Sequence, residues 1–144
     1  MKELYTEIEI QASPEKVWQV LTDLDQYPDW NPFIHHALGK AKESEKVDIT
    51  FRSGSKEMTL HCQVITVKPN QELCWKYHVI APVLFSGIHT FKIEPMETNR
   101  VRFIDREIFS GWLVPLQARD IDTNSRKGFE EMDKALKARA EETK

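Results

Sequence analysis

The sequence has few cysteines, few glycines and no long apolar run. Its 144 residues contain only Cys62 and Cys74 as cysteines. No stretch approaches the roughly 18 consecutive apolar residues of a membrane-spanning helix, and the first residues do not form the apolar run of a signal peptide. We therefore expect a cytoplasmic protein without a membrane span, in which the two cysteines are buried thiols and do not form a disulfide.

Several classes of function lack their usual sequence signals. The five glycines are scattered, so no phosphate-binding loop is expected, and no Gly-x-Ser-x-Gly nucleophile motif occurs. The histidines and cysteines do not have metal-ligand spacing, so we expect neither a metal nor another cofactor. The net charge is only -3, acidic and basic residues are interspersed, and no basic stripe indicates nucleic acid as a partner.

The chain is instead rich in apolar and aromatic residues. About 40% of it is apolar, with seven Phe and four Trp, which is enough for the core of one domain over residues 1–144. Alternating residues predict a first strand over about 4–11. Ser13 as a cap and Pro14 in the first turn predict a helix over about 14–23, and a short helix or turn follows over about 25–30.

Six further strands and one long helix are predicted along the rest of the chain. The strands cover about 33–40, 47–51, 58–67, 73–79, 86–94 and 101–109, with an irregular crossing over 80–84. The long helix follows Pro115. Its inner face is predicted to carry Ile121, Ser125, Phe129, Met132, Leu136 and Ala140, and its outer face Asp122, Arg126, Glu130, Asp133, Lys137 and Glu141. This order of elements indicates the α+β class.

Motifs along nearly the whole chain resemble those of one superfamily. They are Ala12-Ser13-Pro14-Glu15-Lys16-Val17-Trp18, Tyr27-Pro28-x-Trp30-Asn31-Pro32-Phe33, Gly87-x-His89-x-Phe91-x-Ile93-x-Pro95, Glu107-x-Phe109-Ser110-Gly111 and Gly128-Phe129-Glu130-x-Met132. The chain resembles the SRPBCC superfamily, the START/Bet v 1-like helix-grip proteins, and most of all its polyketide cyclase/dehydrase-like branch. The resemblance implies a curved antiparallel sheet of about seven strands in β-α-α-β6-α order. That sheet would wrap around the long C-terminal helix and leave a cavity between them.

The last predicted hairpin carries the polar residues of most interest. If Pro95 lies opposite Val101, then Phe91 lies opposite Asp105 and His89 opposite Glu107. This register places His89, Asp105 and Glu107 on one face with Phe91, Ile93 and Phe103, and a shift of one residue would move the polar groups to the opposite face. The three polar groups could satisfy one another structurally, anchor a ligand or serve as weak candidates for acid/base catalysis.

Other residues are expected to contact a ligand. Trp75 and Tyr77 share one strand face and are predicted cavity walls, and Trp30 could either cover the cavity mouth or fill the core. Trp112 and Leu113 lie in an apolar loop before the long helix and are candidates for a gate. The full set of expected ligand contacts is Trp30, Trp75, Tyr77, His89, Phe91, Phe103, Glu107, Trp112, Leu113, Ile121, Ser125 and Phe129.

Three functions compete at this stage. The first is binding of a small lipophilic or aromatic ligand between the sheet and the C-terminal helix, by a protein that is a monomer or weak dimer. The second is a polyketide cyclase/dehydratase-type enzyme that uses acid/base residues in the same cavity. The third is a partner-binding adaptor, which would expose an apolar patch around residues 112–116.

Overall fold

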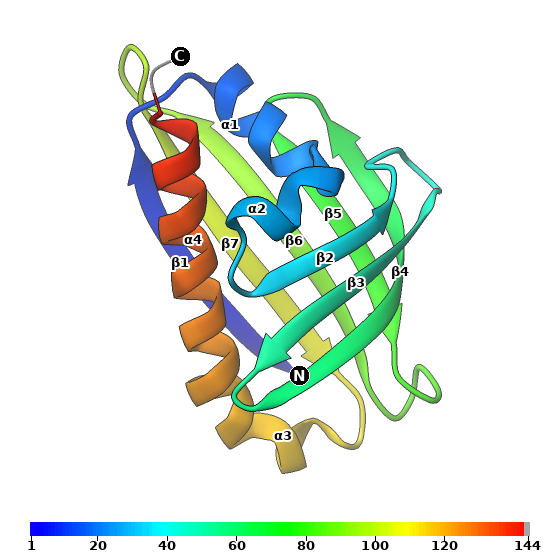
Figure 1. Ribbon diagram of the computed structural model, residues 1–144. Coiled ribbons are helices and arrows are strands. Elements are labelled where there is room, and N and C mark those ends of the chain that lie inside the picture. Colours follow the sequence, from blue (N-terminus) through cyan, green and yellow to red (C-terminus); the bar gives the residue numbers. More distant parts are fainter. Residues whose placement is uncertain (143–144) are drawn as a thin grey trace.

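A computed structural model describes residues 1–142 of the chain (Figure 1). The strands are β1 (Lys2–Ile10), β2 (Ile34–Gly39), β3 (Lys46–Ser53), β4 (Lys56–Lys68), β5 (Glu72–His78), β6 (Ser86–Pro95) and β7 (Val101–Ser110). The helices are α1 (Pro14–Thr22), α2 (Tyr27–Trp30), α3 (Val114–Asp120) and α4 (Arg126–Ala140). A short 3-10 segment, η1 (Leu24–Gln26), precedes α2, and a π-helical segment, η2 (Ile121–Ser125), joins α3 to α4.

All seven strands form one curved antiparallel sheet in the order β1-β7-β6-β5-β4-β3-β2. Figure 1 shows α4 running along β1 on one face of this sheet, with α1 and α2 beside it on the same face. The helix-grip fold predicted from the sequence is therefore confirmed, including the β-α-α-β6-α order. This arrangement turns the inner faces of β5, β6 and β7 toward the helices.

The long helix begins earlier than its apolar period predicts. Helical backbone starts at Val114 and continues through the π-helical segment to Ala140, so the apolar loop expected before this helix ends at Leu113. Pro115 lies in the first turn, where a proline loses no intrahelical hydrogen bond and already has a helical φ angle. An apolar period cannot detect this first turn, because Leu116 on it is exposed.

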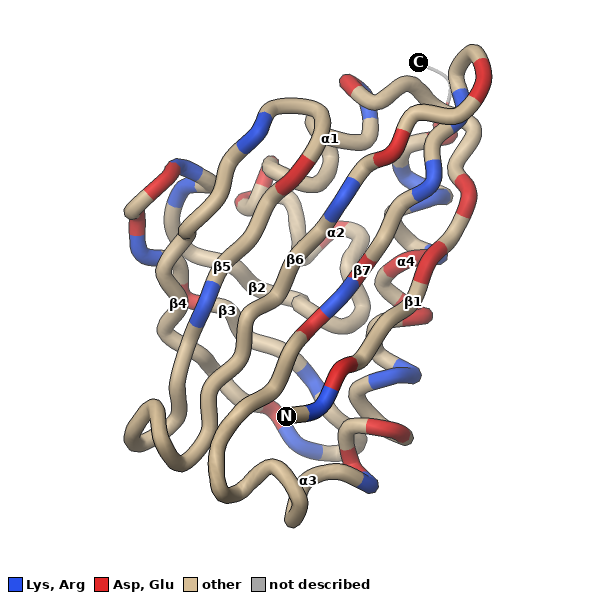
Figure 2. The backbone as a smooth tube through the Cα atoms, turned by 180° about the vertical axis from the view of Figure 1, so that it is seen from behind, with Lys and Arg blue, Asp and Glu red and all other residues tan. Residues whose placement is uncertain are grey.

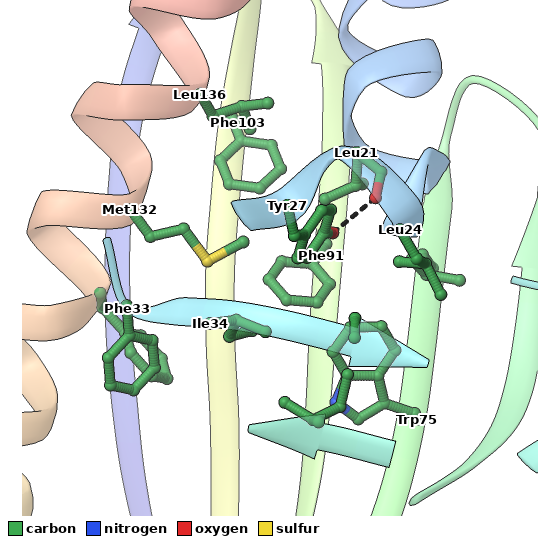
Figure 3. Packing of buried hydrophobic residues seen from close by; sticks show 14 of the residues in the cluster. Leu21, Leu24, Tyr27, Phe33, Ile34, Trp75, Phe91, Phe103, Met132 and Leu136 are labelled. Carbon is green, nitrogen blue, oxygen red and sulfur yellow. Dashed lines mark hydrogen bonds between the residues drawn. The ribbon is translucent and has the colours of Figure 1, made fainter. Parts of the chain in front are cut away.

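The core lies between the inner face of the sheet and the helices (Figure 3). Phe91 and Phe103 are completely buried there, and Tyr27 donates a 2.5 Å hydrogen bond from its hydroxyl to the carbonyl of Leu21. Phe33 packs so closely on α4 that a Cβ at Gly128 would lie 2.2 Å from its ring, so only glycine fits at that point. Cys62 and Cys74 are buried free thiols, as predicted.

Charged residues of both signs are interspersed along the strands, as Figure 2 shows from behind the sheet. Several pair across neighbouring strands: Arg102 of β7 lies 3.2 Å from Glu7 of β1, and Arg106 pairs with Glu3. Such half-exposed pairs contribute little to stability. Within residues 1–142 no helix is both long and apolar enough to cross a membrane.

Candidate functional site

A row of polar side chains crosses the inner face of the sheet beneath α4. Tyr77 lies on β5, His89 on β6, and Asp105 and Glu107 on β7. The predicted hairpin register is correct, since His89 is opposite Glu107 and Phe91 is opposite Asp105. Because apolar residues of the same strands must face the core, this register also brings three ionisable groups inside it.

Aromatic rings fix the position of His89. Its imidazole stacks on the Phe129 ring of α4 with a centroid distance of 4.9 Å and an interplanar angle of 7°. Phe91 lies 4.3 Å away on another side, and Trp75 contacts the imidazole edge-on at 6.0 Å. The ring therefore has little freedom to rotate, and its two nitrogens face different carboxyl groups.

His89 lies between the two carboxyl groups of β7. Its Nε2 is 2.6 Å from Oδ1 of Asp105, and its Nδ1 is 3.3 Å from Oε1 of Glu107. The second oxygen of Glu107 accepts a short hydrogen bond from the Tyr77 hydroxyl. Gly87 makes this last contact possible, because a Cβ there would lie 2.4 Å from the Tyr77 hydroxyl oxygen.

Asp133 extends this cluster, which corrects the prediction that it lies on the outer face of the long helix. Only 3% of its surface is exposed, and the Thr6 hydroxyl of β1 donates a 2.6 Å hydrogen bond to its Oδ2. Its carboxyl group also lies close to that of Asp105, whose charge acts on it. The sequence contains a signal for this position, because Asp133 lies four residues after Phe129 and three before Leu136, which places all three on one helix face.

Burial shifts the pKa of every ionisable group in the cluster. Loss of solvation raises the pKa of Asp133 to about 9, with a further contribution from the nearby charge of Asp105. Burial also raises the pKa of Asp105 well above its ordinary value. It raises the pKa of Glu107 as well, although the charge of His89 and the hydrogen bond from Tyr77 both act to lower that pKa. Burial lowers the pKa of His89. At neutral pH the imidazole is therefore neutral and Asp133 carries a proton.

Two adjoining cavities open from this polar row. The inner one measures about 50 Å³ and is bounded by Trp75, Tyr77, His89 and Glu107 on the sheet and by Phe129 of α4. The outer one measures about 280 Å³ and lies between the ends of β3–β7 and the helical segment after β7. The linings of the two cavities share the side chains of Phe51, Leu60, Tyr77, Phe109 and Ser125, so the cavities adjoin. We refer to the two together as the chamber and to the outer cavity as its mouth.

The structure brings eight of the twelve expected ligand contacts to these two cavities. Trp75, Tyr77, His89, Glu107, Ser125 and Phe129 line the inner cavity, and Leu113 and Ile121 line the outer one together with Tyr77 and Ser125.

The other four lie elsewhere. Phe91 and Phe103 are core residues behind the chamber. Trp30 contacts Tyr27 edge-on at 5.1 Å and borders neither cavity, while Trp112 is 77% exposed.

Some lining residues escaped the sequence analysis. Ile49 and Phe51 of β3 line the inner cavity, as does Leu60 of β4. The alternation over residues 47–51 already separates Ile49 and Phe51 from Asp48 and Thr50 and could have assigned them to the inner face. That β3 curves back over the chamber depends on the pairing of β3 with β4, which local sequence does not reveal.

An exposed apolar patch lies next to the mouth. It consists of Ile80, Val83, Trp112 and Leu116, of which the last two are each 77% exposed. Backbone hydrogen bonds join the two segments that carry it, from Trp112 N to the carbonyl of Val83 and from Leu113 N to that of Leu84. An exposed patch at this position is what the partner-binding hypothesis predicts.

Over the described range 1–142, no group of three or more His, Cys, Asp or Glu side chains is arranged to hold a metal ion.

Comparisons with known proteins agree with this architecture. Residues 1–141 match the model of a family described as "Polyketide cyclase / dehydrase and lipid transport", which confirms the resemblance seen in the sequence motifs. No curated protein matches the chain by sequence.

Solved structures with similar folds share little sequence with the chain. A protein from Mesorhizobium loti is 22% identical, with a TM-score of 0.77 and 99% of each chain covered. The Zhui aromatase/cyclase from Streptomyces sp. R1128 is 15% identical, with a TM-score of 0.80 and coverage of 97% of this chain and 93% of that one. A START superfamily protein from Mycobacterium smegmatis is 18% identical, with a TM-score of 0.78 and coverage of 96% and 97%. At these identities the likeness establishes the fold.

Proposed function

Because the chain belongs to the polyketide cyclase/dehydrase and lipid transport family, we propose that it binds an uncharged lipophilic small molecule in the chamber beneath α4. The ligand's polar end points at Tyr77 and Glu107. The observation that carries this proposal is a chamber lined mostly by aromatic and aliphatic side chains, with a few polar groups gathered at its inner end. Ligand sites in proteins typically have this composition.

The volumes suggest the size of the ligand. An apolar cavity of roughly 150 Å³ can hold one benzene ring, so the outer cavity of about 280 Å³ has room for about two rings. The inner cavity of about 50 Å³ has room only for a group of about one or two heavy atoms, such as a hydroxyl or carbonyl. A two-ring molecule with one small polar substituent fits both.

The charges disfavour an anionic ligand. The described lining of the inner cavity contains no Lys or Arg, and the ionisable groups nearest to it are Glu107 and His89. A buried carboxylate on the ligand would therefore lose its hydration without gaining a cationic partner, which is costly. Lys56 borders only the outer cavity, together with Asp120.

A matched pair of probes tests this proposal. Titration calorimetry at pH 7 should show binding of 2-naphthol, with 2-naphthoate at least tenfold weaker. S125F should abolish binding by filling the junction of the two cavities, whereas L116F, at an exposed position, should bind like the wild type. Equal binding of the two probes, or binding that S125F leaves unchanged, would refute the proposal.

A second function is favoured by one observation, the contact between Glu107 and His89 at the wall of the chamber. A carboxyl group with a raised pKa next to a neutral imidazole can accept or donate a proton, as cyclase or dehydratase chemistry requires. 2-Tetralone, a two-ring ketone, provides the test, because proton abstraction next to its carbonyl incorporates deuterium from D₂O. We expect the wild type to accelerate incorporation over buffer and E107Q to lose the acceleration while still binding the ketone.

A further inference from the structure

The polar row continues past the chamber to the side of α4 that borders β1. From Glu107 it passes through His89 and Asp105 to Asp133, with the distances of 3.3 Å and 2.6 Å at the two nitrogens of His89 given above. Beyond Asp133 lies Thr6 on the edge strand β1. Every residue of the polar row is buried, so the row is a continuous polar track through an apolar core.

The far end of the track borders a groove on the surface. This groove measures about 360 Å³ and lies between β1 and α4, and Thr6 and Asp133 are part of its lining. No residue is common to the linings of the groove and of the two cavities of the chamber. The track therefore connects two separate places at which water can be reached.

The contact between Asp105 and Asp133 shows where a mobile proton lies. Within residues 1–142 no N–H or O–H group reaches Oδ2 of Asp105 or Oδ1 of Asp133, although both oxygens are buried. Two carboxyl groups in contact satisfy such oxygens when one of them is protonated and donates to the other. Burial raises the pKa of both carboxyl groups, so the pair holds a proton at neutral pH.

We propose that Glu107, His89, Asp105 and Asp133 form a proton-transfer path between the chamber and the groove. Outward transfer moves one proton at each step: from Glu107 to Nδ1 of His89, from Nε2 of His89 to Asp105, and from Asp105 to Asp133, which has released its own proton to water in the groove. Only O–H and N–H bonds break and form, and the reverse order returns a proton to Glu107. The hydroxyl of Thr6 stabilises the carboxylate of Asp133 during the transfer.

The path allows Glu107 to exchange protons while a ligand closes the mouth of the chamber. The proposed path involves only residues of the protein, and its test needs no ligand. A failure to bind a ligand would therefore not contradict the path.

Charged and titratable groups surround both ends of the path. Asp133 faces Asp105 and His89 inside, and the groove around it is bordered by Glu7 of β1 and by Arg126, Glu130 and Lys134 of α4. Glu107 interacts with His89, Tyr77 and Cys62, and Asp105 with Tyr27. The groove end is therefore the more polar of the two.

Exchange of the His89 ring N–H with water tests the path. The measurement uses ¹⁵N-histidine-labelled protein and NMR, with H89F to assign the signal. Two changes of carboxyl to amide, D133N at the groove end and E107Q at the chamber end, remove one proton carrier each with little change of shape. If protons enter from the groove, D133N should slow exchange at least tenfold and E107Q should slow it less.

Each outcome of this experiment either supports or overturns the proposed path. The control E130Q alters a carboxylate at the rim of the groove outside the path and should exchange like the wild type. The proposal is overturned if exchange in D133N equals that in the wild type, or if E107Q slows it as much as D133N does. If D133N does not fold, T6V decides, because valine keeps the shape of threonine and removes only the hydroxyl: slower exchange supports the path, and unchanged exchange overturns it.

Discussion

The burial of Asp133 predicts that the free energy of unfolding of this protein falls as pH rises through the neutral range. The pKa of Asp133 is about 9 in the folded chain, against an ordinary value of 3.8. Between these two values the folded protein holds a proton that the unfolded chain has lost. The contribution of Asp133 is therefore complete below about pH 4 and is lost as pH rises toward 9.

The size of the effect follows from proton linkage. One bound proton corresponds to about 1.4 kcal/mol in the free energy of unfolding per pH unit. From pH 5 to pH 8 the contribution of Asp133 should therefore fall by up to about 4 kcal/mol. D133N lacks the titrating group, so the stability of the wild type relative to D133N should decrease by this amount over the same range.

Urea unfolding followed by circular dichroism at pH 5, 6, 7 and 8 measures the difference. E130Q, which lies on the exposed face of the same helix, is the matched control and should run parallel to the wild type. Parallel curves for the wild type and D133N would show that Asp133 is ionised in the folded protein. The reasoning about the acid cluster would then be wrong.

Three other substitutions test separate parts of the structure. G87A should destabilise the protein by about 1–3 kcal/mol in urea unfolding, because the added Cβ would displace the Tyr77 ring, and a shift of less than 0.5 kcal/mol would contradict that contact. N31A should lower the free energy of unfolding by about 2–3 kcal/mol, because Asn31 Oδ1 accepts hydrogen bonds of 3.0 and 2.8 Å from two buried backbone N–H groups at the start of β2. Thermal unfolding measures this loss, and an unchanged Tm would contradict the prediction. W112A should change stability by no more than about 0.5 kcal/mol, because Trp112 is largely exposed, and a larger loss in calorimetry would place this side chain in the core.

Much of the site could be predicted from sequence because strands impose a simple rule. Side chains alternate between two faces, and three apolar residues in the last hairpin had to be buried. That condition selected the register in which His89 lies opposite Glu107, and the structure has this register. The same reasoning assigned Trp75 and Tyr77 to one face, where both line the chamber.

Other assignments depended on neighbours far away in the sequence. The sequence predicts that Asp133 is exposed as a charged residue of a surface helix, yet a protonated carboxyl group that accepts a hydrogen bond from Thr6 and lies close to Asp105 can be buried. Trp30 lies next to prolines in a turn, and nothing local distinguishes a lid from a residue that contacts Tyr27.

The sequence by itself determined the order of elements, the family and the faces of the strands, because periodicity and caps act over a few residues. Only the tertiary structure decided that five residues from β1, β6, β7 and α4 meet in one buried row, and that this row connects a chamber to a groove. The physical reason is that the pKa of a carboxyl group and its partners are properties of the packed neighbourhood, which strands and helices distant in sequence build together.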